Sequence, residues 1–113
     1  MPTNRFQDLI VWQKSRDLAV EIYKLTSLFP KSEIYGLVSQ MRRAVISISS
    51  NIAEGYHRFH DKEKKQFTAI AFGSGGELES QLEVAKVLFP ELDYSKCFSL
   101  LSETMRILNK FLN

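Results

Sequence analysis

The 113-residue sequence has few of the residues that interrupt or cross-link a chain: one cysteine, three prolines and five glycines. The single cysteine, Cys97, excludes an intrachain disulfide and fits a reducing compartment. No apolar run approaches the roughly 20 residues that a membrane-spanning helix needs, and residues 1–9 lack the apolar core of a signal peptide. We therefore expect a cytoplasmic protein with no membrane partner.

Long acidic tracts and Gly/Ser-rich stretches are also missing, so the sequence predicts no disordered segment. Hydrophobic residues make up 44% of the chain and charged residues 25%, close to globular averages. The length suffices for one hydrophobic core and is too short for two, so we expect a single domain over residues 1–113. A formal charge of +2 permits nucleic-acid contact without requiring it.

Apolar residues recur at spacings of three and four along the chain, and the alternation of a β-strand is absent. Pro30 and Pro90 separate the first and last of these periodic segments from the middle of the chain. Ser32 and Asp61 are suited to helix N-caps, and Gly55 to a C-terminal stop. The predicted helices cover residues 6–29, 32–55, 61–89 and 93–112. The expected core positions of the first two are Val11, Ser15, Leu18, Ile22, Leu25 and Phe29, and Ile34, Val38, Met41, Val45, Ile48 and Ile52. Short connections between helices of similar length predict an all-α, antiparallel up-down-up-down four-helix bundle.

The third predicted helix carries interior glycines, each of which costs about 1 kcal/mol relative to alanine. The segment Gly73-Ser74-Gly75-Gly76 therefore marks either a kink or a close approach by a neighbouring helix. We favour close packing, because the apolar spacing stays in phase across the segment. The expected core positions of this helix are Phe67, Ile70, Ser74, Leu78, Gln81, Ala85 and Leu88.

The fourth predicted helix has two apolar stripes, one through Leu101 and Leu108 and the other through Cys97, Ile107 and Phe111. A bundle this small has no room for both stripes inside, which predicts a homo-oligomer with the remainder at a subunit interface. The alternative is a monomer with scattered exposed apolar residues.

Catalytic and metal-binding signatures are absent from the sequence. His57 and His60 lie in an expected loop without an acid or cysteine to complete a metal site. Small polar residues near position 50 lack an oxyanion-hole motif, and Glu54 is a single acid. We therefore expect no enzyme and no cofactor, and we interpret Ser47 and Asn51 as small hydrogen-bonding groups that let helices approach closely.

The candidate functional feature is a set of basic residues on the second helix and around the turn that follows it: Arg42, Arg43, Arg58, Lys62, Lys64 and Lys65. Tyr56 and Phe59 are interleaved with them, and this mixture suits phosphate contacts combined with base stacking. Acidic Asp61 and Glu63 dilute the charge, so a solvated, salt-bridged helix end is the alternative.

Several motifs spread over nearly the whole chain resemble one bacterial family of four-helix bundles. The family is named for proteins encoded in the intervening sequence of 23S ribosomal RNA genes, and it includes the accessory variability determinant proteins of diversity-generating retroelements. Its most specific motif here is Asn51-Ile52-Ala53-Glu54-Gly55. The other matching motifs are Leu9-x-x-Trp12-Gln13-Lys14, Tyr23-Lys24-Leu25-Thr26, Phe29-Pro30, Gly36-Leu37, Ser39-Gln40-Met41-Arg42-Arg43-Ala44, Ser47-Ile48, Gly73-Ser74 and Glu77-Leu78-Glu79.

The resemblance implies a subunit of a homopentameric ring without catalytic residues. It implies a role with ribosomal RNA for the intervening-sequence branch, and binding of nucleic acid and a reverse transcriptase for the retroelement branch. This chain departs from the family at Ser49, where proline is usual, at Phe72, where a basic residue is common, and at Gly75-Gly76, where larger residues are usual. The low charge favours the first branch. The sequence thus predicts a homo-oligomer that binds RNA, with a protein scaffold or reverse-transcriptase partner as the alternative.

Overall fold

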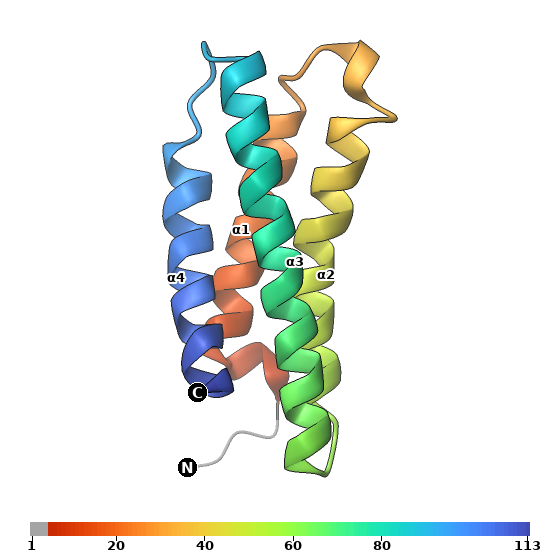
Figure 1. Cartoon of the computed structure of the whole chain (residues 1–113), viewed down its shortest axis with the longest axis vertical. Coiled ribbons are helices and arrows are strands. Elements are labelled where there is room, and N and C mark those ends of the chain that lie inside the picture. The colour runs from red at the N-terminus through yellow and green to blue at the C-terminus, as the bar shows by residue number, and fades with distance from the viewer. Residues whose placement is uncertain (1–4) are drawn as a thin grey trace.

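The computed structural model describes residues 5–113, which form four α-helices and two short 3-10 helices (Figure 1). The bounds in chain order are η1 (Phe6–Asp8), α1 (Ile10–Thr26), η2 (Lys31–Glu33), α2 (Leu37–Tyr56), α3 (Asp61–Leu88) and α4 (Ser95–Leu112). Residues 5–113 contain no β-strand, and the four helices pack into a body of 44 × 22 × 22 Å. The predicted all-α four-helix bundle is confirmed.

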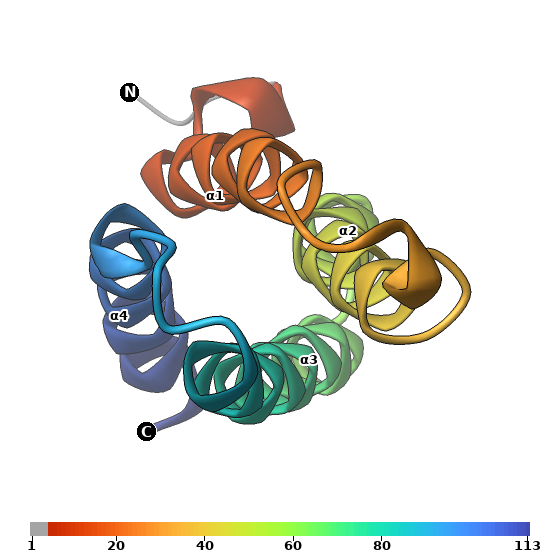
Figure 2. The ribbon, with the colours of Figure 1, turned by 90° about the horizontal axis from the view of Figure 1, so that it is seen from above.

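Consecutive helices run in opposite directions. Ser47 of α2 lies against Ser74 of α3, whereas Gly55, further along α2, lies against Phe67, which is earlier in α3. Figure 1 shows the same alternation in the colour of the ribbon, and Figure 2 shows the four helices around a common centre. Each helix contacts the next, and α4 closes the ring on α1. Two ion pairs show the reversal between α1 and α4: Lys14 with Glu103 and Glu21 with Lys96.

The core follows the predicted apolar stripes of α1 and α2 closely. All six expected core positions on the first helix are buried: Val11, Ser15, Leu18, Ile22, Leu25 and Phe29. On the second helix five of the six are buried, namely Val38, Met41, Val45, Ile48 and Ile52. Ile34 is exposed because it precedes α2, in the connection that contains η2.

The expected core positions on the third helix are partly wrong. Its buried residues are Ala71, Gly75, Leu78, Leu82 and Ala85, while Ile70 and Leu88 are exposed. Small residues allow a neighbouring helix to approach, and a Cβ atom at Gly75 would overlap the Met105 side chain of α4. α3 continues without interruption through this segment, so the kink is excluded. Close packing is confirmed at Gly75 alone, because Gly73 and Gly76 face open space.

The fourth helix also differs from its prediction. Within the single chain both of its stripes are buried or half-buried, except that Phe111 is 56% exposed. The premise that the bundle has no room for both stripes is therefore wrong. The exposed apolar side chains lie mainly elsewhere, as on the outer face of α3, where Ile70, Val84 and Val87 are exposed.

The helix ends differ from the predicted ones by a few residues. Ser32 lies in η2 instead of capping α2, and Gly36 precedes α2. His60, rather than Asp61, occupies the N-cap position of α3. Gly55 lies inside α2 with no positive φ, so it is not a left-handed stop. Its role is close approach, because a Cβ there would lie 3.0 Å from Cβ of Phe67.

Among residues 5–113, no helix is both long and apolar enough to cross a membrane.

Candidate nucleic-acid interface

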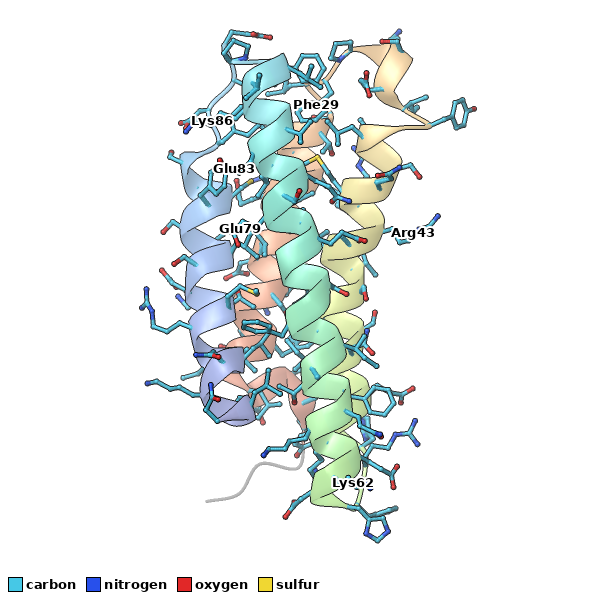
Figure 3. All side chains as sticks on the ribbon, in the orientation of Figure 1. Phe29, Arg43, Lys62, Glu79, Glu83 and Lys86 are labelled. Atoms are coloured by element: carbon cyan, nitrogen blue, oxygen red, sulfur yellow. The ribbon has the colours of Figure 1, made fainter. Side chains whose placement is uncertain are left out.

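The structure separates the six predicted basic residues into two groups. Arg42 and Arg43 lie in the first half of α2, whereas Arg58, Lys62, Lys64 and Lys65 lie at the α2–α3 turn. The segment from Arg43 to Tyr56, at the end of α2, spans about 20 Å of helix. In Figure 3 Arg43 points away from the bundle, far from Lys62 at the lower end. Four of the six residues therefore come together, in a segment called here the basic turn (residues 56–65).

Arg42 is held against the end of α1. Its Nε atom donates a hydrogen bond of 2.9 Å to Oγ1 of the buried Thr26, and its guanidinium lies 4.4 Å from the ring centroid of Tyr23. A weaker bond of 3.4 Å runs from Nη2 to the carbonyl oxygen of Tyr23. Arg42 therefore fastens α2 to α1, whereas Arg43 is exposed to solvent.

Two cations of the basic turn, Arg58 and Lys64, make contacts within the bundle. The Arg58 guanidinium lies 4.8 Å from the ring centroid of Phe67 and 3.7 Å from Oε1 of Glu54. Lys64 Nζ donates a hydrogen bond of 3.3 Å to the carbonyl oxygen of Tyr56. Tyr56 lies in the last turn of α2, where the helix dipole favours a cation. These contacts stabilise the positive charges without hiding them, since Arg58 and Lys64 are only half-buried.

The other residues of the turn face the solvent. Lys62 and Lys65 are exposed, and neither forms an ion pair with any other of residues 5–113. Phe59 is 95% exposed, an unusual environment for a large aromatic side chain. Asp61 and Glu63 begin α3, where negative charge suits the helix N-terminus. The turn thus offers cations and an open aromatic ring side by side.

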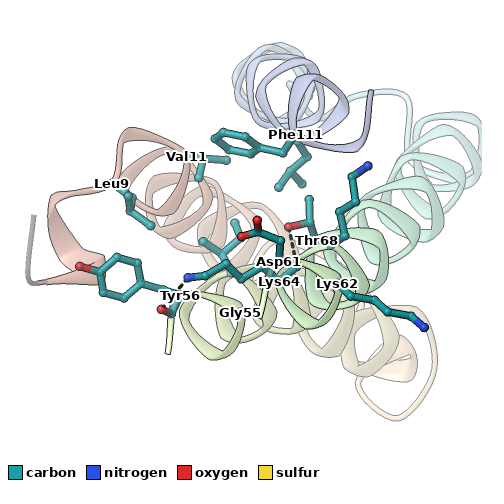
Figure 4. A pocket seen from close by; sticks show the side chains of 12 residues that line it. Leu9, Val11, Gly55, Tyr56, Asp61, Lys62, Lys64, Thr68 and Phe111 are labelled. Carbon is teal, nitrogen blue, oxygen red and sulfur yellow. Dashed lines mark hydrogen bonds between the residues drawn. The ribbon is translucent and has the colours of Figure 1, made fainter. Parts of the chain in front are cut away.

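A cavity of about 620 Å³ opens beside the basic turn, where the starts of α1 and α3 meet the ends of α2 and α4 (Figure 4). Its apolar walls are Leu9, Val11, Ile52, Gly55, Leu108 and Phe111. Its polar lining is Tyr56, Asp61, Lys62, Lys64, Lys65 and Thr68. Sequence reasoning missed this cavity because its walls come from segments far apart in the chain.

His57 and Cys97, the other residues considered for metal binding or catalysis, make packing contacts within the bundle. The His57 ring packs edge-on against Phe6 and Tyr56, with centroids 5.8 and 5.6 Å away. Within residues 5–113 no three His, Cys, Asp or Glu side chains gather where they could hold a metal ion. Cys97 is buried, and burial, reinforced by the charges of Glu21 and Asp93, raises its thiol pKa to about 11.

The comparison with known families gives a match over almost the whole chain. The model of the family described as 23S rRNA-intervening sequence protein matches residues 7–110. The chain belongs to this family. The resemblance drawn from the Asn51–Gly55 motif is thereby confirmed, whereas no curated individual protein matches the chain.

The family motif contributes to the contact between α2 and α3. Asn51 Nδ2 donates to the carbonyl oxygen of Ser47 at 2.8 Å and to its Oγ at 3.1 Å. The Ser47 Oγ in turn shares a hydrogen bond of 2.8 Å with Oγ of Ser74 on α3. Together with Gly55 against Phe67, these small groups hold the two helices at close range.

Proposed function

We propose that the protein is a non-catalytic, cytoplasmic RNA-binding protein that contacts RNA through the basic turn. The observation that carries this proposal is Phe59, 95% exposed and next to Arg58 in the chain. A water-exposed aromatic ring of this size loses the stabilisation that burial gives, and a stacked base restores it. Nearby cations supply the phosphate contacts that dominate nucleic-acid affinity.

The arrangement suits an unpaired loop or strand better than a duplex. Phe59 requires a splayed base for stacking, and such bases occur in single-stranded RNA. Lys62 and Lys65 lie in the first turns of α3 and are exposed, so they are available for contacts with the phosphates of the same strand. The two acids at the start of α3 limit the total charge, which favours a short contact of a few phosphates.

Fluorescence anisotropy of a labelled 12-nucleotide RNA, titrated at several salt concentrations, tests the proposal. For single strands the slope of log affinity against log salt is about −0.7 for each phosphate neutralised. The double variant Lys62→Ala/Lys65→Ala should therefore reduce the slope by about 1.4. The matched control is Lys31→Ala/Lys86→Ala, which removes two exposed lysines at the opposite end of the bundle and should leave the slope unchanged.

Phe59→Ala should weaken RNA binding by roughly five- to a hundredfold, the range that loss of one stacked base gives. Affinity that does not depend on salt, or equal slopes for the two double variants, would refute the proposal.

The outer face of α3 supports a second part of the proposal: the chain assembles into a homo-oligomer, such as the pentamer that the family resemblance implies. Exposed residues recur there at spacings of three and four, opposite the buried stripe: Ile70, Gly73, Glu77, Ser80, Val84 and Val87. Such a seam with valines and small residues is suited to packing against another helix. A second copy of the chain is the occupant we propose.

Light scattering on a sizing column measures this directly against the 13.0 kDa chain mass. Val84→Lys/Val87→Lys should give the monomer mass, whereas the control Leu28→Lys, at an exposed site on the α1–α2 connection, should keep the oligomer. A wild-type monomer would refute self-assembly and favour the alternative function, a scaffold for a different protein such as a reverse transcriptase.

A further inference from the structure

The lining of the cavity beside the basic turn is suited to a largely apolar group with polar edges. Its volume of about 620 Å³ is typical of small-ligand sites. Leu9 and Val11 form one wall, and Leu108 and Phe111 form another. Phe111 is 56% exposed, so its ring is open to contact from the cavity. A nucleobase is a ligand with these properties.

The polar groups at the cavity mouth are mainly acceptors and cations. Asp61 is exposed, and no hydrogen bond or ion pair joins its carboxylate to another of residues 5–113. Asp61 and Thr68 both line the cavity and lie two turns apart on α3, about 10 Å along the helix axis, while Lys62 extends away from the apolar walls in Figure 4. The Thr68 hydroxyl donates to the carbonyl oxygen of Lys64 at 2.9 Å, so its oxygen is left as an acceptor.

We propose that this cavity receives one unpaired nucleobase of the bound RNA and prefers guanine to uracil, with Asp61 as the acceptor that reads the base. The proposal rests on the proposed function and adds a specificity to it. The lysines that line the mouth are those of the basic turn, so a backbone bound there carries its base to the cavity.

The preference follows from hydrogen-bond chemistry. An ionised carboxylate accepts and does not donate. Guanine presents its N1–H and N2–H groups on one edge, where both reach the two oxygens of a carboxylate. Uracil presents one N–H between two carbonyl oxygens, which the carboxylate repels. Asp61 therefore stabilises guanine and disfavours uracil.

The test compares two labelled 12-nucleotide RNAs, one of uridines only and one with a single central guanosine. The guanosine should raise affinity about tenfold, within the range of one good bidentate base contact. Asp61→Asn should abolish this difference. The matched control is Glu63→Gln, which changes the charge equally in the same turn of α3 but does not line the cavity, and it should keep the difference.

A second pair of variants examines the apolar wall. Phe111→Ala should lower the affinity for the guanosine RNA to that for the uridine RNA and leave the uridine RNA unaffected. Phe59→Ala should weaken both RNAs equally, because Phe59 lies outside the cavity.

The outcomes separate this proposal from the proposed function. Equal, salt-dependent binding of both RNAs overturns the base site and leaves RNA binding standing. If neither RNA binds, the proposed function fails. The base site is then tested separately by titrating the protein with GMP or UMP and recording the NMR signals of the methyl groups of Leu9, Val11 and Leu108. Shifts with GMP alone would support it, and no shifts would overturn it.

Discussion

Replacing the glycines of α3 by alanine gives a direct measure of how closely α4 approaches. Gly75 and Gly76 are neighbours in the same helix, yet a Cβ at Gly75 overlaps the Met105 side chain, whereas a Cβ at Gly76 meets nothing within 4 Å. The same substitution therefore adds a methyl group to a packed contact in one case and to solvent in the other.

The two substitutions should change the free energy of unfolding by different amounts. Alanine is more favourable than glycine in a helix interior by about 1 kcal/mol, so Gly76→Ala should stabilise the protein by that amount. For a domain of this size, that corresponds to a rise in Tm of about 4 °C. Gly75→Ala gains the same propensity, but the Met105 side chain has to move. Since the atoms in the way form the flexible end of a half-buried methionine, the cost should lie at the low end of the overpacking range, about 1 kcal/mol. The net effect of Gly75→Ala should therefore be close to zero.

Urea denaturation followed by circular dichroism measures these changes in the free energy of unfolding. Met105→Ala removes the obstructing side chain, so Gly75→Ala in that background should stabilise by about 1 kcal/mol, as Gly76→Ala does. Light scattering at the same protein concentration ensures that all variants are compared in one oligomeric state. If Gly75→Ala alone raises stability as much as Gly76→Ala, α4 does not require glycine at this position and the packing argument is refuted.

Three further predictions concern single side chains. Arg42→Ala should lower the free energy of unfolding by about 1–2 kcal/mol, because it removes a charged hydrogen bond to Thr26, and should leave RNA affinity unchanged. Tyr94→Phe should cost about 1–2 kcal/mol, because the hydroxyl shares its single proton between the carbonyl oxygens of Ala85 and Phe89, at 3.0 and 2.9 Å. Cys97 has a folded-state pKa of about 11 against 9.0 ordinarily, so the unfolded chain ionises first, and stability should fall by about 2–3 kcal/mol between pH 9 and 11.

Each of these has a matched control. Arg43→Ala removes the same charge from an exposed site and should change stability by less than about 0.5 kcal/mol, so equal losses would contradict the role of Arg42. A Tyr94→Phe variant as stable as the wild type would show that the two carbonyl groups find other donors. Cys97→Ala should lose stability less steeply between pH 9 and 11, and parallel pH profiles for it and the wild type would exclude the thiol as the cause.

The first helix was predictable from sequence because its apolar stripe is a single band. The expected core positions recur every three or four residues between Val11 and Phe29, with polar and charged residues between them, and all of them are buried. Pro30 and Pro90 also fall in the connections, where their missing N–H groups do no harm.

The third helix was predicted less well because the expected stripe lies one residue away from the buried stripe over part of its length. The expected positions Ile70, Ser74 and Gln81 are direct neighbours of the buried Ala71, Gly75 and Leu82, whereas Leu78 and Ala85 belong to both stripes. Ala71 and Gly75 are small and give a weak hydropathy signal, so the periodicity that starts at Phe67 selects their neighbours. The distinction depends on the shape of the neighbouring helices, which the periodicity of one segment does not contain.

Only the part of the candidate site that is contiguous in sequence could be predicted. The basic turn is continuous in sequence, so its charges and Phe59 were visible at once. Arg42 has the same charge but lies on another stretch of α2, and only the packing of Thr26 and Tyr23 beneath it shows its structural role. The cavity walls required the fold itself, because they join residues near position 10, position 52 and position 110.

The family motif and the candidate site are physically coupled through Phe67. Gly55 permits α3 to approach so closely that a Cβ there would lie 3.0 Å from Cβ of Phe67. The ring of Phe67 in turn lies under the Arg58 guanidinium. A larger residue at position 55 would therefore move α3 and displace a cation of the basic turn, even though Gly55 offers no chemical group to a ligand. On this structure, the motif that identifies the family acts by positioning the turn that follows it.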